Sequence, residues 1–189
     1  MVTDPFPRLK ARRADYELSD QTADVEVPSD GRLRAPARRL EAAIRAEDRE
    51  AVREAGEAFL AAAASFYQVS KPGLRVLAAR PLRSREGWTM ELFGDYNPLT
   101  KVIRVWMRTA VRKQVTSYGT LLSTLCHEFC HHLDYERYRW VGSPHTRGFY
   151  ERTAALYHHA RNTPRKRLVW RIYDVGRWQI DWKRTRQGS

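Results

Sequence analysis

Residues 126–134 read CHEFCHHLD and place three of the chain's six histidines in one short stretch. If this stretch is helical, His127 and His131 are four residues apart and point to the same side of the helix. Two imidazoles so placed can bind one Zn²⁺ ion at about 2.0–2.1 Å. Glu128 is rotated from this row by about 100°, where a carboxylate can act as general base toward a metal-bound water. The HExxH pattern therefore predicts a zinc site with two ligands and a base on one helical turn.

A catalytic zinc ion needs a third protein ligand and an open fourth position. His145 lies in the predicted first turn of the next helix, which can fold back and present it to the metal. Glu151 is an alternative carboxylate ligand, almost two turns further along that helix. Asp134 shares the first helix and is better placed to accept a hydrogen bond from a ligand imidazole. We therefore expect His127, His131 and His145 to bind the metal, with Asp134 supporting one of them.

The elements that position these residues follow from the spacing of apolar residues. The pattern predicts helices from Pro36 to about residue 70, with a break near Glu47-Asp48, and another from Tyr118 to Tyr135 capped by Ser117. Ser143-Pro144 is a start signal for a further helix, which ends before Asn162. These segments would carry most of the core and both halves of the metal site.

Three runs between the helices are typical of β-strands, namely LRVLAAR at 74–80, WTMELFG at 88–94 and KVIRVWMR at 101–108. Turn residues at 84–87 and 95–98 separate them, which favours an antiparallel three-stranded meander. Near the C-terminus, residues 167–184 alternate apolar and charged residues around Asp-Val-Gly, which predicts a β-hairpin. The expected fold class is therefore α+β.

Residues 1–35 are polar, with scattered Pro, Asp and Arg, and we expect a flexible basic arm there. Residues 36–189 would then form a single domain, since the 42% hydrophobic content suffices for one core. No apolar run is long enough to span a bilayer, and the two cysteines, four residues apart, do not suggest a secreted disulfide framework. We expect a cytoplasmic protein without membrane contact, of undetermined oligomeric state.

The chain is strongly basic, with 34 Lys and Arg against 22 Asp and Glu, a formal net charge of +12 and a pI of about 10.1. Such a balance favours nucleic acid or acidic proteins as partners. However, 28 of the 34 basic residues are arginine, a skew that a GC-rich coding sequence also produces. Charge alone therefore supports two interpretations: the protein binds nucleic acid, or its arginine content only reflects the composition of its coding sequence.

The segment HEFCHHLD followed by SPHTRGFYER resembles the SprT-like zinc metallopeptidases. Their pattern is HExxH, a spacer of about this length, and a His followed within a few residues by an aromatic, which His145 and Phe149 match. The resemblance covers roughly residues 40–160 and implies a zincin-like fold. It also implies His127, His131 and His145 as ligands of one Zn²⁺ and Glu128 as the catalytic base.

Two departures from the family pattern concern the substrate. Many members continue into a cysteine-rich zinc ribbon, whereas the predicted hairpin 167–184 stands there in this chain, and Thr146 replaces the glycine that often follows the third His. Some members act on proteins crosslinked to DNA, which the positive charge would suit. The resemblance also implies that the strand 101–108 is an edge strand that pairs with an extended substrate.

The predicted activity is hydrolysis of a peptide bond in a protein or peptide by a zinc-bound water, with Glu128 moving the proton. Two other interpretations stay open. One is a nucleic-acid-binding module in which zinc is structural, and the other is a zinc hydrolase of non-peptide amides or esters. The motif by itself is compatible with all three.

Overall fold

The computed structural model describes residues 1–85 and 88–188, which divide into two units. One unit is Pro28–Leu133, and the other combines Met1–Val27 with Asp134–Ser189. Helix α4 (Tyr118–Glu136) belongs to both, because the division falls between Leu133 and Asp134. In this division the first residues of the chain group with its C-terminal part, and the single domain expected over 36–189 stays a prediction.

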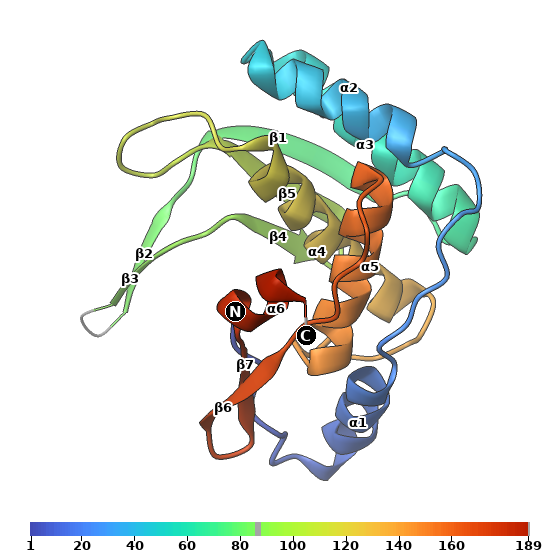
Figure 1. The fold of residues 1–189 in the computed structure, drawn as a ribbon, viewed down its shortest axis with the longest axis vertical. Coiled ribbons are helices and arrows are strands. Elements are labelled where there is room, and N and C mark those ends of the chain that lie inside the picture. Colours follow the sequence, from blue (N-terminus) through green and yellow to red (C-terminus); the bar gives the residue numbers. More distant parts are fainter. Residues whose placement is uncertain (86–87, 189) are drawn as a thin grey trace. The chain divides into compact units, whose positions relative to one another are not determined.

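In the unit Pro28–Leu133, two helices follow the predicted periodicity (Figure 1). They are α2 (Arg34–Arg45) and α3 (Arg49–Tyr67), with the break at the predicted place. Glu47 has a φ of 55°, and the carboxylate of Asp48 accepts hydrogen bonds from two backbone N–H groups in the first turn of α3. The chain reverses there because a left-handed residue ends one helix and an N-cap starts the next.

The same unit contains a mixed three-stranded sheet in the order β1-β5-β4 and a separate two-stranded ribbon. The strands are β1 (Gly73–Ala79), β2 (Leu82–Arg85), β3 (Trp88–Glu91), β4 (Gly94–Asn97) and β5 (Val102–Arg108). In the sheet, β5 is parallel to β1 and antiparallel to β4, while β2 pairs with β3 in the ribbon. The predicted antiparallel meander is therefore wrong.

The error arises between residues 88 and 97. The strand predicted at 88–94 ends at Glu91 within the ribbon, and the segment taken for a turn forms β4 instead. Gly94 and Asp95 at the start of β4 are residue types that are typical of turns. In this strand, Gly94 instead allows close packing. A Cβ atom at Gly94 would lie 2.5 Å from Thr124 Cγ2, so glycine permits the close approach of β4 to α4. Part of the turn predicted at 84–87 lies outside the described residues.

The order of the sheet also changes the role of β5. It lies between β1 and β4 (Figure 1), so residues 101–108 are central, and the expected edge strand is wrong. Ile103 and Val105 are buried and Arg104 between them is exposed, while the next two residues, Trp106 and Met107, are both buried. Arg104 forms an ion pair with Asp95 on the neighbouring β4. The face with Ile103 and Val105 is therefore apolar, and the opposite face carries the Arg104–Asp95 ion pair beside the buried Trp106.

Helices α3 and α4 cover the apolar face of the sheet. A Cβ atom at Gly56 of α3 would lie 2.5 Å from Leu74 Cδ2 of β1 and 4.0 Å from Leu125 Cδ2 of α4, so the three elements meet there. Helix α4 has almost the predicted bounds, and Ser117 Oγ accepts the N–H of Thr120 at 3.1 Å. The predicted cap is confirmed, and it sets where the HExxH helix begins.

The second unit contains α1 (Arg13–Gln21), preceded by the 3₁₀ turn η1 (Lys10–Arg12), and α5 (Arg147–Arg161). A Cβ atom at Gly148 would lie 2.1 Å from the carbonyl oxygen of Ser19, so the end of α1 presses on the start of α5. The expectation of a flexible arm over 1–35 differs from this arrangement. A polar sequence can still dock when its backbone carbonyls meet donors on a partner helix.

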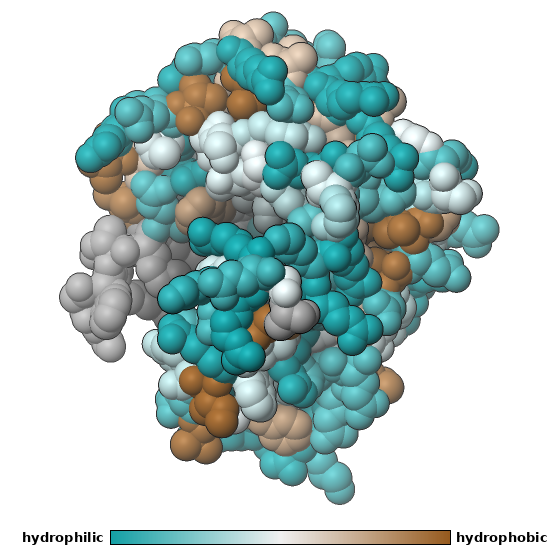
Figure 2. All heavy atoms as spheres, in the orientation of Figure 1, coloured by the Kyte–Doolittle hydropathy of each residue, from teal (hydrophilic) through white to brown (hydrophobic). Residues whose placement is uncertain are grey.

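The predicted C-terminal hairpin is confirmed. It consists of β6 (Trp170–Asp174) and β7 (Arg177–Ile180), and the short helix α6 (Trp182–Gln187) follows it. Val2 makes an antiparallel bridge to Gln179, so the start of the chain adds to the outer side of β7. At the tip of this hairpin, where Val175 is exposed, Figure 2 shows hydrophobic residues in a mostly hydrophilic surface. Among the described residues, no helix is long and apolar enough to cross a membrane.

Candidate metal centre

Helix α4 places His127 and His131 one turn apart, as its predicted periodicity requires. Their ring centroids are 4.9 Å apart and the rings are almost perpendicular, at 83°. Both residues are partly exposed, whereas Phe129 and Leu133 of the same helix are buried. The apolar side of α4 therefore sets the rotation of the helix and leaves the two imidazoles on an accessible side.

His145 joins these two residues in one group. One ligand atom from each of His127, His131 and His145 lies within 4.8 Å of the others, and within the described part of the chain this is the one such group found. All three side chains are partly exposed. Three imidazole nitrogens this close together can hold a metal ion.

His145 lies just outside α5. Thr146 is the N-cap, because its Oγ1 accepts the N–H of Phe149 at 3.0 Å, so His145 precedes the helix instead of lying in its first turn as expected. The His145 ring packs against Phe149 edge-on at 5.1 Å and stacks with Tyr150 at 5.8 Å. These two rings restrict the imidazole to a narrow range of orientations.

Asp4 is a further partner of His145. One oxygen of its carboxylate, Oδ2, accepts the backbone N–H of His145 at 2.9 Å and lies 3.3 Å from the ring nitrogen Nδ1. Burial alone would raise the pKa of Asp4, but the hydrogen bonds from His145 and the charges of His145 and Arg177 outweigh it and lower that pKa. Asp4 is therefore an ionised carboxylate at neutral pH, next to the imidazole.

Sequence reasoning missed Asp4. It lies 141 residues before His145, in the segment that we expected to be a flexible arm. Its local pattern, a single Asp before a proline, is common in loops and indicates no site. Within the sequence alone, no signal connects the two positions, because the contact depends on how the N-terminal segment pairs with the C-terminal hairpin.

Glu128, the predicted base, is buried in α4, with 5% of its surface exposed. Burial raises its pKa to about 8, and the negative charge of Asp95 adds to the effect. Its carboxylate borders β4, where a Cβ atom at Gly94 would lie 2.8 Å from Glu128 Oε1. Before a metal binds, Glu128 is therefore largely protonated at neutral pH, and a nearby cation would favour its ionised form.

Asp134 accepts hydrogen bonds from two side chains in the part of the chain that contains His145. Its Oδ1 accepts a hydrogen bond from Arg152 Nη2 at 3.0 Å, and its Oδ2 accepts one from Ser143 Oγ at 2.7 Å. Burial raises the pKa of Asp134 to about 6, against the opposing effects of Arg152, Ser143 and His145. The carboxylate therefore holds the loop before His145 through Ser143, and its two oxygens bind these two donors.

The alternative ligand Glu151 lies outside the histidine group. Its carboxylate accepts the N–H of Leu168 at 2.9 Å and binds Arg165 at 3.2 Å, so it anchors the chain after α5. His132, next to the ligand row, is fully buried: Nε2 contacts the carbonyl oxygen of Ser70 at 2.7 Å. Both residues hold neighbouring segments in place.

Comparisons of the chain with protein-family models, with curated proteins and with solved structures found no match. The resemblance to SprT-like metallopeptidases therefore stays a prediction from the residues of the two motif segments. Among the described residues, His127, His131 and His145 form a group that can hold a metal ion. The chemistry of three imidazole donors indicates which ion this group would suit.

Proposed function

We propose that the protein is a zinc-dependent metallopeptidase. The observation that carries the proposal is the grouping of His127, His131 and His145 within 4.8 Å, with Glu128 on the same helix as two of them. Imidazole nitrogens suit Zn²⁺, and three protein ligands leave the fourth position open, as catalytic zinc sites require. A structural zinc site usually has four protein ligands, so the donor set favours catalysis.

The fit of the residues to zinc also supports a division of roles. When bound, zinc supplies Lewis acidity, which polarises a carbonyl oxygen and acidifies water. Glu128 accepts a proton from the attacking water and returns it to the leaving amine. Its pKa of about 8 before metal binding is near neutrality, where one group can both accept and donate a proton.

The position of β4 supports an extended peptide as substrate. In the described sheet, β4 pairs with β5 on one side and has no partner strand on the other. A peptide that adds to this free edge would form main-chain hydrogen bonds with β4. Because Gly94 on this strand is in contact range of Glu128, the peptide backbone would come close to the proposed base. This replaces residues 101–108 as the substrate-binding strand.

The charge of the chain supports one class of substrate in particular. With a net charge of +12, the protein should associate with polyanions at low salt. We therefore propose proteins associated with nucleic acid as a substrate class. A nucleic acid that concentrates enzyme and substrate together would raise the rate of hydrolysis, and added salt would remove that increase.

The test uses the purified 189-residue chain. It measures zinc content and the hydrolysis of a fluorescently labelled protein, with and without DNA. We expect one zinc ion per chain and hydrolysis that a chelator abolishes. His145→Ala should lose the zinc, whereas His158→Ala is a matched control, because His158 is a partly exposed histidine on α5 that bonds to Thr163 at 2.9 Å. Glu128→Gln should keep the zinc and lose hydrolysis.

The other two interpretations predict different results. A structural zinc in a nucleic-acid-binding module predicts bound zinc, DNA binding and no hydrolysis in either wild type or Glu128→Gln. A zinc hydrolase of another class predicts cleavage of small esters or amides but of no protein substrate. Full zinc binding by His145→Ala would contradict the proposed ligand set.

A further inference from the structure

The first four residues form a strap between the C-terminal hairpin and His145. The N–H of Thr3 donates to the carbonyl oxygen of Trp178 at 2.8 Å, and the N–H of Trp178 donates to Thr3 Oγ1 at 2.8 Å. One residue later, the N–H of Asp4 donates to the carbonyl oxygen of His145 at 2.9 Å, while its carboxylate accepts the N–H of His145. Both ends of the strap are therefore held by backbone hydrogen bonds.

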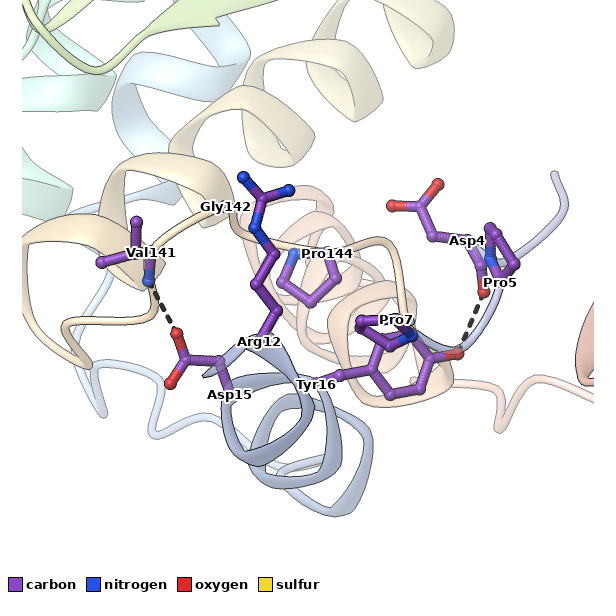
Figure 3. Close-up of a pocket in the computed structure, with 9 residues that line it drawn as sticks. All are labelled: Asp4, Pro5, Pro7, Arg12, Asp15, Tyr16, Val141, Gly142 and Pro144. Carbon is purple, nitrogen blue, oxygen red and sulfur yellow. Dashed lines mark hydrogen bonds between the residues drawn. The ribbon is translucent and has the colours of Figure 1, made fainter. Parts of the chain in front are cut away.

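Two tyrosines hold the strap from the side. Tyr150 stacks with the His145 ring and donates its hydroxyl to the carbonyl oxygen of Val2 at 3.1 Å. Tyr16 of α1 donates its hydroxyl to the carbonyl oxygen of Asp4 at 3.0 Å, a bond drawn in Figure 3. Tyr16 also lines a pocket of about 210 Å³ together with Asp4 and with Pro5 and Pro7, which follow the strap. The backbone of Asp4 is thus fixed on three sides.

The carboxylate of Asp4 is aimed at one nitrogen of the His145 ring. Oδ2 lies 3.3 Å from Nδ1, so a proton on Nδ1 points to a negative charge. In a neutral imidazole only one nitrogen carries the proton, and the lone pair for a metal is on the other. Carboxylates that hold metal-binding histidines in this way fix the ring and make the free nitrogen more basic.

We propose that Asp4 is the positioning residue of His145, holding the proton on Nδ1 so that Nε2 presents its lone pair to the metal. The inference rests on the proposed metal site and adds to it a residue from the opposite end of the chain. It also assigns a role to the hairpin β6–β7, which holds the strap through Trp178. The third ligand is therefore oriented by the meeting of the two ends of the described chain.

Three variants separate positioning from general stability. Asp4→Asn keeps an oxygen that can accept the backbone N–H and removes the charge, while Asp4→Ala removes both. Asp15→Asn is the control, because Asp15 holds the same loop before His145 through a different contact, accepting the N–H of Val141 at 3.0 Å (Figure 3). Thermal unfolding of the metal-free proteins shows that each variant folds.

The first readout is zinc affinity, measured by competition with a chromogenic chelator. We expect a loss of about tenfold in Asp4→Asn and up to about 100-fold in Asp4→Ala, the range seen when the carboxylate partner of a ligand histidine is removed. Asp15→Asn should bind zinc within about twofold of wild type. Equal losses in Asp4→Asn and Asp15→Asn, or full affinity in both Asp4 variants, would overturn the proposal.

The second readout needs no metal. The ¹⁵N chemical shifts of the His145 imidazole in the metal-free protein report which nitrogen is protonated. We expect Nδ1–H in wild type and in Asp15→Asn, and a shift of the proton toward Nε2 in Asp4→Ala. A wild-type ring protonated on Nε2 would contradict the proposal even if a variant failed to fold. Wild type without zinc affinity would refute the metallopeptidase, while the tautomer would still decide the role of Asp4.

Discussion

Asp134 and Arg152 form an ion pair inside the unit that contains His145: Nη2 and Oδ1 are 3.0 Å apart, and the side chains are 0% and 1% exposed. Asp134 lies in the last turn of α4 and Arg152 in α5. The guanidinium also donates to the carbonyl oxygen of Ser19 at 3.0 Å, at the end of α1. One buried cation therefore joins three helices of this unit around the loop before His145.

Arg152→Met should destabilise the protein strongly. Removing one partner of a buried pair leaves the other charge without compensation, which costs about 3–5 kcal/mol of unfolding free energy. Arg45→Ala is the control: its side chain is 77% exposed in an i,i+4 pair with Glu41, and such pairs contribute about 0.3–0.5 kcal/mol. Urea unfolding measures both. A loss below about 1 kcal/mol in Arg152→Met would show that the pair is dispensable.

Gly94→Ala should impair the site more than its small size suggests. The added Cβ would lie 2.5 Å from Thr124 Cγ2 and 2.8 Å from Glu128 Oε1, so β4 or the proposed base has to move. We expect a loss of about 1–3 kcal/mol in stability and a larger fractional loss of hydrolysis than of zinc affinity. Gly31→Ala, where nothing lies within 4 Å, should change stability by no more than about 1 kcal/mol. Full activity in Gly94→Ala would show that the close approach of β4 to Glu128 is not needed for hydrolysis.

The stability of the metal-free protein should depend on pH through Glu128. Its pKa is about 8 in the folded state against 4.5 as the ordinary value, so between these values the folded state binds a proton that the unfolded chain has lost. The free energy of unfolding therefore falls as pH rises through this window. Glu128→Gln lacks this titration, so its free energy of unfolding should not fall in this way. As the pH rises toward 8, the free energy of unfolding of the variant should therefore gain a few kcal/mol relative to that of wild type, at about 1.4 kcal/mol per pKa unit.

Urea unfolding with a chelator, at pH 5.5 and at pH 8, checks this difference. Glu91→Gln is the control, because hydrogen bonding to Arg80 lowers the pKa of Glu91 and places its contribution below this window. Its unfolding free energy should change in parallel with that of wild type. If Glu128→Gln also followed wild type in parallel, its carboxylate would have an ordinary pKa.

The sequence by itself determined the helices α2, α3 and α4 and the first half of the site. The i, i+4 spacing of His127 and His131, the cap at Ser117 and the break at Glu47 all act over a few residues. Helical periodicity and capping are local, so they can be predicted from neighbours in the chain. His145 also followed from its spacing to the HExxH motif, although its place just before α5 did not.

Tertiary structure decided the remainder, because strand pairing and buried polar contacts join residues that are far apart in sequence. Residues 95–97 were predicted as a turn, but they belong to β4, which Gly94 allows to approach α4 closely. The contacts of Asp134 with Arg152 and Ser143 join residues whose pairing no local pattern indicates. Asp4 reads as part of a flexible arm until the hairpin and His145 hold it. In each case the contact joins residues that come together only when the chain folds and buries them, and no local sequence pattern encodes such a contact.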